Sequence, residues 1–171
     1  MSASLPDNRR KRGFVPLVDP CTQVLILGSL PGTASLAAGQ YYANPRNRFW
    51  QLIGSVIGRN DLPALLYDQR LAVLAARGIG LWDVFTSAER LGSLDSAIRS
   101  AAPAPLTAMV ARLPALQAIA FNGKLAAKAG RKAVGAPPLA LIDLPSSSPA
   151  NAAIRFETKL EHWAGLKQFL I

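Results

Sequence analysis

Gln23-Val-Leu-Ile-Leu-Gly28 is a short run of apolar residues that ends in a glycine. Such a run is typical of a strand that is buried on both faces of a parallel sheet. Further runs of this kind follow at residues 78–83, 116–121 and 139–144. Segments with helical periodicity separate them, and strands that alternate with helices indicate a parallel sheet covered on both faces. We therefore predict an α/β fold, a three-layer α/β/α sandwich around a central four-stranded parallel sheet.

Helices are expected where apolar residues recur every three or four positions. The predicted helical segments are residues 48–58, 62–77, 95–100, 106–113, 124–134 and 151–170. Residues 28–47 are rich in Gly, Pro, Ser and Asn and are expected to form one long loop, a kind of segment that usually serves function.

The first residues of the chain differ from the rest in charge. Residues 1–14 are predicted to be a flexible basic arm, and residues 15–171 a single domain. The basic residues of the arm are Arg9, Arg10, Lys11 and Arg12.

Length and composition limit the classes to which the protein can belong. The chain has 171 residues, half of them hydrophobic and 17% charged, which suits one domain with a sizeable core. Nineteen Lys and Arg against ten Asp and Glu give a net charge of +9. This cationic excess favours a polyanionic partner, either a nucleic acid or an anionic membrane surface. No amphipathic helix accompanies the basic arm, so we expect no membrane partner.

A single cysteine, Cys21, and a single histidine, His162, limit the chemistry of the chain. One cysteine cannot form an internal disulfide or a cysteine-ligated zinc site, and one histidine excludes a two-histidine metal site. His162 falls beside the apolar stripe of the last predicted helix, where a surface or packing role is expected. We therefore expect no metal, no cofactor and a reducing, cytoplasmic setting. Residues 20–45 lack charge but are broken by Gly and Pro, which makes them a poor membrane span.

Small or polar segments follow each predicted strand, at residues 28–32, 82–83, 122–124 and 145–149. Ligands of α/β sheets bind beyond the carboxyl ends of the strands, so we expect these segments to form one cleft.

Two of these segments allow two interpretations each. Asp83, at the end of the second strand, either takes part in catalysis or caps the following turn. The serine-rich segment 145–149 either grips a phosphate or caps a helix, with Ser148 as the cap and Pro149 in the first turn. Both interpretations of the serine-rich segment can hold together.

Tyr41-Tyr-Ala-Asn-Pro-Arg-Asn-Arg-Phe-Trp50 gathers aromatic, amide and guanidinium side chains in an otherwise apolar chain. Tyrosine rings stack on bases, arginine pairs with phosphate, and asparagine reads a base edge or holds a water. Phe49 and Trp50 are expected to anchor the core. For either of the two tyrosines, together with Asn44 and Asn47, we predict a functional role.

Five segments of the chain carry a resemblance to a known family. They are Gly28-Ser-Leu-Pro-Gly32, Tyr41 through Trp50, Gly80-Leu-Trp-Asp-Val84 with Gly92-Ser-Leu-Asp-Ser96, Phe121-Asn-Gly123, and Leu144 through Asn151. In these segments the chain resembles the uracil-DNA glycosylase superfamily, and within it the hypoxanthine-DNA glycosylase branch. The segments occur in the order of the family and span about residues 20–155.

Two positions depart from the wider superfamily. Leu30 stands where the usual first motif carries an Asp or Asn that activates water, and Leu144 stands where the second motif often begins with His. Mismatch-type glycosylases also lack that histidine and are more similar in this segment. The water must therefore be held from elsewhere, and in the hypoxanthine branch the resemblance implies an asparagine after the first motif. We place it at Asn44, with Asn47 as the fallback.

The resemblance also implies roles for other residues of the cleft. Backbone N–H groups near Ser29, with Asn122, would stabilise charge on the departing base, which would stack on Tyr41 or Tyr42. Asp83 would hydrogen-bond the base edge or assist its protonation. The residues expected to bind DNA are Pro31, Gly32, Arg46, Asn47, Lys124, Ser146, Ser147, Ser148 and Pro149. Among them, Ser146 and Ser147 would clamp a phosphate, and Ser148 with Pro149 would form a wedge.

The implied function is that of a monomeric DNA glycosylase that acts on double-stranded DNA containing a deaminated base. It would flip out the base, with hypoxanthine as the expected substrate, and hydrolyse its N-glycosidic bond to leave an abasic site. One alternative is a mismatch-specific uracil-DNA glycosylase. The other is a non-catalytic DNA-binding protein on the same scaffold, an alternative that Leu30 and Leu144 support.

Overall fold

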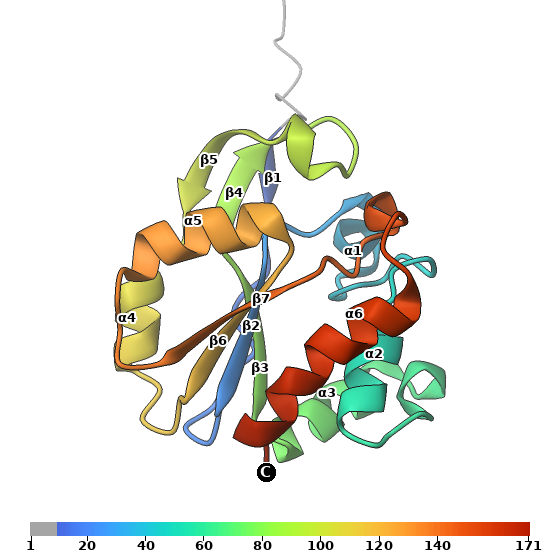
Figure 1. The fold of residues 1–171 in the computed structure, drawn as a ribbon. Coiled ribbons are helices and arrows are strands. Elements are labelled where there is room, and N and C mark those ends of the chain that lie inside the picture. The colour runs from blue at the N-terminus through green and yellow to red at the C-terminus, as the bar shows by residue number, and fades with distance from the viewer. Residues whose placement is uncertain (1–9) are drawn as a thin grey trace, which may run out of the picture.

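A four-stranded parallel sheet forms the centre of the fold in the computed structural model, which describes residues 10–171 (Figure 1). The strand order is β3-β2-β6-β7, and every neighbouring pair is parallel. The strands are β2 (Val24–Gly28), β3 (Ile79–Asp83), β6 (Ala118–Asn122) and β7 (Ala140–Leu144). All residues of β2, β3 and β6 are buried, which explains their continuous apolar sequences. The predicted sheet is confirmed.

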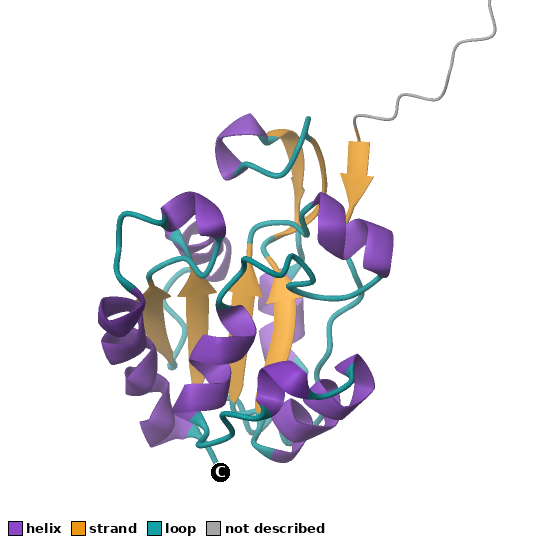
Figure 2. Ribbon diagram, turned by 90° about the vertical axis from the view of Figure 1, so that its right-hand side faces the viewer, coloured by secondary structure: helices purple, strands orange, loops and turns teal. Residues whose placement is uncertain are grey.

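Helices cover both faces of this sheet, so the predicted three-layer sandwich is confirmed as well (Figure 2). On one face lie α2 (Phe49–Val56), α3 (Tyr67–Ala76) and α6 (Phe156–Trp163), the last continued by a 3₁₀ segment at Ala164–Phe169. The other face carries α4 (Leu106–Ala111) and α5 (Lys124–Val134). The side chains of β2 alternate between the two cores, with Val24 and Ile26 in one and Leu25 and Leu27 in the other.

A second, smaller sheet stands beyond the carboxyl ends of the parallel strands (Figures 1 and 2). It is antiparallel, in the order β1-β4-β5, and consists of β1 (Arg10–Arg12), β4 (Phe85–Glu89) and β5 (Arg99–Pro103). This sheet is not predicted from the sequence. The residues of its strands are exposed or half-buried, except for the buried Ala88, and lack the apolar runs that mark the central strands.

Two predictions are wrong because of this sheet. Residues 10–12 of the predicted flexible arm form an edge strand, in which the Arg10 guanidinium donates to the Ser100 carbonyl at 3.1 Å and to Ser87 Oγ at 2.8 Å. The rest of the arm, including Arg9, lies outside the described residues. The helix expected at residues 95–100 is one 3₁₀ turn at Asp95–Ala97, after which the chain enters β5 and pairs with β4.

Further boundaries also differ from the prediction. The loop expected at residues 28–47 contains α1 (Thr33–Ala38), a six-residue helix that ends at Gly39 in the left-handed conformation, with φ of 64°. The last helix begins at Phe156 instead of residue 151, because residues 149–151 form a separate 3₁₀ turn. Ser148 caps this turn by accepting the Ala150 N–H at 3.2 Å, and Pro149 occupies its first position. The capping interpretation of the serine-rich segment is thus confirmed, although for a shorter element.

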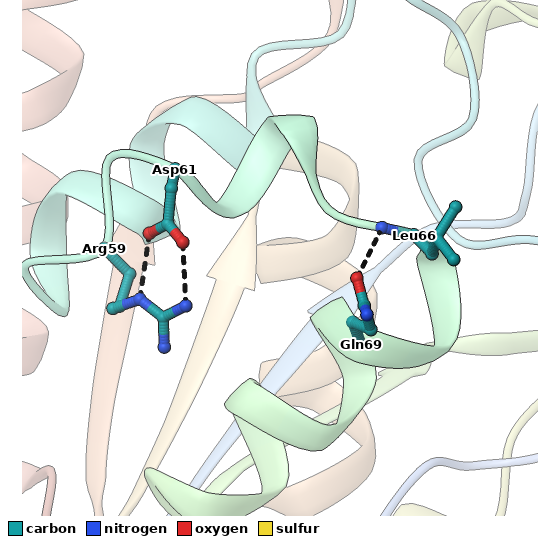
Figure 3. A network of polar contacts seen from close by, with 4 residues as sticks. All are labelled: Arg59, Asp61, Leu66 and Gln69. Carbon is teal, nitrogen blue, oxygen red and sulfur yellow. Dashed lines mark hydrogen bonds and ion pairs between the residues drawn. The ribbon is translucent and has the colours of Figure 1, made fainter.

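The connection between α2 and α3 is fixed by local polar contacts (Figure 3). Arg59 donates two hydrogen bonds of 2.8 Å to the Asp61 carboxylate, and Gln69 Oε1 accepts the Leu66 N–H at 3.1 Å at the start of α3. The Arg59–Asp61 pair is solvent-exposed and adds little to stability. Within residues 10–171, no helix has both the length and the apolar character that a bilayer crossing requires.

Candidate active site

A cavity of about 480 Å³ opens at the carboxyl ends of the parallel strands β2, β3 and β6, whose last residues Gly28, Asp83 and Asn122 line it. Segments 28–32, 83, 122 and 146–149 all contribute to its lining, which confirms the expected cleft. Its volume falls in the range of sites that enclose a small ligand. The cavity brings together fourteen of the fifteen predicted site residues: Ser29, Pro31, Gly32, Tyr41, Tyr42, Asn44, Arg46, Asn47, Asp83, Asn122, Ser146, Ser147, Ser148 and Pro149.

Asp83 is the buried carboxyl of the cavity. It ends β3 in register with Gly28 of β2, and a Cβ added to Gly28 would meet Asp83 Oδ1 at 2.7 Å. Any side chain at position 28 would therefore displace the carboxyl group. Asp83 Oδ2 is buried and has no hydrogen-bond partner among the described residues.

The surroundings of Asp83 change its proton affinity. Burial raises the pKa of Asp83 to about 7, because the ionised form loses its hydration. The nearby Arg90 guanidinium opposes this increase in pKa, and the Asp95 carboxylate adds to it. At neutral pH the Asp83 carboxyl can therefore hold a proton and release it, which an ordinary aspartate cannot do.

Asn122, at the end of β6, joins three parts of the cavity wall. Its Nδ2 donates to Ser147 Oγ at 2.9 Å and to Tyr42 Oη at 3.4 Å, while its Oδ1 accepts the Ser147 N–H at 2.9 Å. These bonds fix the orientation of the carboxamide and tie the serine-rich loop to the sheet. Ser147 is fully enclosed by this network, whereas Ser146 and Ser148 are partly exposed.

The two tyrosines occupy different environments. The Tyr42 ring stacks on Phe49, with ring centroids 3.9 Å apart, and its backbone has a φ of 55°. Tyr41 is buried, and its hydroxyl donates to the Val15 carbonyl at 3.3 Å while its ring meets the edge of Phe14. Burial raises the pKa of both hydroxyls, so both remain neutral. The expected core role of Phe49 and Trp50 is confirmed, since both are buried.

The asparagines of the 41–50 segment hold the backbone around them. Asn44 Oδ1 accepts the Arg46 N–H at 2.9 Å in an exposed turn. Asn47 Oδ1 accepts the Phe49 N–H at 2.9 Å and so supports the start of α2. In the described part of the chain, the Nδ2 groups of Asn44 and Asn47 have no hydrogen-bond partner and are available to a ligand or a water.

Lys124 is the predicted site residue that does not line this cavity. It lines an adjoining hollow of about 450 Å³, which shares residues 93–95, Ser146 and Ser148 with the first cavity. His162 is exposed on α6 and lines neither hollow, in line with the surface role expected for it. Among residues 10–171, no three His, Cys, Asp or Glu side chains are grouped as a metal site would require.

No role is predicted from the sequence for the segment 90–95, of which Ser93, Leu94 and Asp95 form a further part of the cavity wall. The Arg90 side chain is buried and donates to the carbonyls of Leu30 and Pro31, while its Nε has no partner in the described structure. Ser29 Oγ donates to Asp95 Oδ1 at 2.6 Å. Two residues of the Gly92–Ser96 motif thus contact the first loop, Asp95 through Ser29 and Ser93 by accepting the Thr33 N–H at 2.9 Å.

Comparisons with known proteins agree with this architecture. The pattern of the uracil DNA glycosylase superfamily matches residues 15–167. A protein of Methanosarcina barkeri named hypoxanthine DNA glycosylase is 44% identical over 115 residues, which are 67% of this chain and 72% of the relative. A protein of the same name from Methanosarcina acetivorans is 44% identical over 116 residues, or 68% of this chain and 73% of the relative.

A solved structure is similar over almost the whole chain. It is the solution structure of a Methanosarcina acetivorans protein described as a candidate uracil DNA glycosylase, with a TM-score of 0.81 and 38% sequence identity. The similarity covers 94% of this chain and 98% of that protein. The chain therefore belongs to the uracil DNA glycosylase superfamily, in the branch of the proteins named hypoxanthine DNA glycosylase.

Proposed function

We propose that the protein is a monofunctional DNA glycosylase that removes hypoxanthine from deoxyinosine in double-stranded DNA and leaves an abasic site. Its family and the names of its two Methanosarcina relatives support this function. The observation that carries the proposal is the cavity itself, in which a buried carboxyl with a pKa of about 7 lies among asparagine and serine side chains. Such a site suits cleavage of a bond whose leaving group needs a proton.

In the first step, the cationic surface attracts the duplex and the damaged nucleotide rotates into the cavity. The net charge of +9 favours this encounter. Ser146 and Ser148, with the backbone around them, bind the phosphate beside the flipped nucleotide, and Arg46 and Lys124 add positive charge nearby. Ser147 acts through Asn122, since its N–H and hydroxyl both bond to that side chain. Unstacking costs a few kcal/mol and is cheapest for a weakly paired base, which favours deaminated purines.

In the second step, the bond between C1′ and N9 breaks and its electron pair stays on the purine. A proton on the purine ring makes this departure easier, and we assign its delivery to the protonated Asp83 carboxyl. Asn122, held by Ser147 and Tyr42, and the backbone near Ser29 line the same cavity and stabilise charge on the base. The base stacks on the ring of Tyr42 and not on that of Tyr41, because Tyr41 is more deeply buried.

In the third step, a water oxygen bonds to C1′ and the water releases its proton to solvent. Asn44 orients this water, because a carboxamide can accept and donate hydrogen bonds but is a poor base. The Nδ2 of Asn44 has no hydrogen-bond partner in the described structure, and the Oδ1 of Asn44 accepts only the Arg46 N–H, in an exposed turn. The corresponding oxygen of Asn47 supports the first residue of α2, so Asn47 remains the fallback. We further propose that the protein acts as a monomer in the cytoplasm, where its exposed single cysteine, Cys21, suits a reducing environment.

A single-turnover assay tests the proposed function. Protein in excess is mixed with labelled duplexes that carry one inosine, one uracil or one xanthine, and alkaline cleavage reveals abasic sites. Strand scission at inosine is the expected result. Scission at uracil alone would instead assign the protein to mismatch-type uracil excision. Tight, salt-sensitive binding without scission on any duplex would favour a non-catalytic DNA-binding protein.

A further inference from the structure

The exposed residues of α5 are all basic, and the other residues of this helix are buried or half-buried. These exposed residues are Lys124, Lys128, Arg131 and Lys132. With 3.6 residues per turn, their positions fall within about 100° of one another around the helix axis, on the side opposite the buried Ala126 and Gly130. No acidic residue lies within α5. The helix therefore presents a continuous basic face to its surroundings.

Most of this positive charge is not neutralised within the described part of the chain. Arg131 pairs with the Asp143 carboxylate at 2.9 Å. The side chains of Lys124, Lys128 and Lys132, which we call the lysine stripe, form no ion pair with residues 10–171. Neighbouring lysines of the stripe are four residues apart, and like charges at this spacing repel each other and weaken a helix. Helix stability therefore does not explain the stripe, whereas a bound polyanion would relieve the repulsion.

The lysine stripe begins at the candidate active site and leads away from it. Lys124 lines the adjoining hollow of about 450 Å³, together with Ser146 and Ser148, which also line the main cavity. Because an α-helix rises 1.5 Å per residue, Lys132 lies about 12 Å further along the helix than Lys124. Each strand of a DNA duplex carries one phosphate per about 3.4 Å of its axis, so the stripe can follow about three phosphates.

The helix that carries the stripe is held firmly against the sheet. Gly130 lies so close to β6 that a Cβ at this position would clash with the Phe121 ring. In the next residue, the Arg131 guanidinium lies over the same ring and binds Asp143 on the edge strand β7. The backbone positions of the three lysines are therefore fixed relative to the cavity, and only their side chains become ordered when a ligand binds.

We propose that the lysine stripe binds the DNA backbone beyond the flipped nucleotide, on one side of the damaged base only. This inference rests on the proposed function and deepens it. The damaged strand passes Ser146 and Ser148, crosses the adjoining hollow, and places its next phosphates along Lys124, Lys128 and Lys132. The protein therefore needs a duplex arm on this side of the lesion for full affinity, and an arm on the other side does not replace it.

The test measures affinity at several salt concentrations for duplexes with one 2′-fluorinated deoxyinosine, whose glycosidic bond resists cleavage. One duplex has long arms on both sides of the lesion, and in two others one arm or the other is cut back. A double variant, Lys128→Gln with Lys132→Gln, leaves the lining of both hollows unchanged. On the long duplex, its slope of log affinity against log salt should be smaller than that of the wild type by about 1.8, because each phosphate contact contributes about 0.9. This difference should disappear when one particular arm is cut back and persist when the other is.

The matched control is Arg112→Gln with Lys167→Gln, which removes the same charge from two exposed side chains that line neither hollow. An equal loss of slope in this control, or an unchanged slope in the Lys128→Gln, Lys132→Gln variant, would overturn the role of the stripe. A loss that does not depend on which arm is cut back would also overturn it. Cleavage of an ordinary inosine duplex by the wild type tests the proposed function in parallel. Absence of cleavage together with the expected loss of slope would refute that function and support the stripe, so the two failures are distinguishable.

Discussion

The two walls of the cavity are held together by different forces. One wall is built from residues 41–47 and 146–150 and contains one charged side chain, Arg46. It is held together by neutral amide and hydroxyl groups around Asn122 and Ser147, and we call it the neutral wall after these groups. The other wall, formed by Ser93, Leu94 and Asp95, belongs to the segment 90–95, whose buried Arg90 guanidinium and Asp95 carboxylate both act on Asp83; we call this segment the charged wall. The neutral wall can hold a water or approach a phosphate without disturbing the charges of the site. Burial raises the pKa of Asp83, the group that we assign to the leaving base, and the charged wall adjusts this pKa, since Arg90 lowers it and Asp95 raises it.

The neutral wall is tested most strongly at Asn44. We expect Asn44→Ala to slow single-turnover excision of hypoxanthine by about 100-fold or more, because the attacking water loses its orientation. Binding to an uncleavable inosine duplex should stay within about threefold of the wild type, since the phosphate contacts remain. An excision rate near that of the wild type would remove Asn44 from the mechanism. A comparable loss in Asn47→Ala alone would give the role to the fallback residue.

Asp83 makes the folded protein sensitive to pH. Its pKa of about 7 in the fold lies above the ordinary value of 3.8, so folding favours the protonated form and loses stability as pH rises from about 4 through 7. Because asparagine cannot ionise, the Asp83→Asn variant should not lose stability over this pH range through this group. Between pH 4 and 8 the unfolding free energy of the wild type should fall relative to that of Asp83→Asn by on the order of 2–4 kcal/mol. Urea unfolding at both pH values measures this, and parallel pH dependences would contradict it.

Replacing either of the two charged residues of the charged wall should shift the pKa of Asp83, and the two shifts should be opposite in direction. Removing the positive charge in Arg90→Gln should raise the pKa of Asp83, and removing the negative charge in Asp95→Asn should lower it. Asp95→Asn keeps an oxygen that can accept the Ser29 hydroxyl. The alkaline limb of the excision rate should therefore move to higher pH in the first variant and to lower pH in the second. A shift of the alkaline limb in the same direction in both variants would show that the charges of Arg90 and Asp95 do not explain the role of this wall.

The smallest expected effect concerns the four consecutive basic residues at positions 9–12, of which residues 10–12 form β1. Replacing Arg9, Arg10, Lys11 and Arg12 by Ala should reduce the slope of log affinity against log salt by at most about 4, because each phosphate contact contributes about 0.9. Arg59→Ala is the control, since that side chain is already paired with Asp61 away from the cavity. Titrations at several salt concentrations measure both slopes. An unchanged slope in the fourfold variant would mean that this segment does not contact DNA.

The same division between the walls explains what could be predicted from the sequence. The central strands are buried on both faces, so β2 reads as an uninterrupted apolar run, and the residues at its end fall into the cleft by topology alone. The neutral wall was predicted because Asn44, Asn47 and the serines stand in compact polar segments.

The charged wall could not be predicted in the same way. In β4 only Thr86 is exposed and only Ala88 is fully buried, and the strand contains only one large apolar side chain, Phe85, which gives no clear strand signal. Arg90 bonds to backbone carbonyls about 60 residues away, and a backbone carbonyl leaves no trace in the sequence. Asp95 belongs to the Gly92–Ser96 motif, but its contact with Ser29 depends on the loop that the small sheet positions.

The pH dependence of single-turnover excision tests most directly whether a buried acid drives departure of the base. Wild type and Asp83→Asn are compared on the same inosine duplex from about pH 5 to 9, with circular dichroism to show that both remain folded. The wild-type rate should fall about tenfold per pH unit above the pKa of about 7, because only the protonated carboxyl donates. The variant should be slower at low pH and should lack this limb. Identical profiles for the two proteins would contradict the role of Asp83.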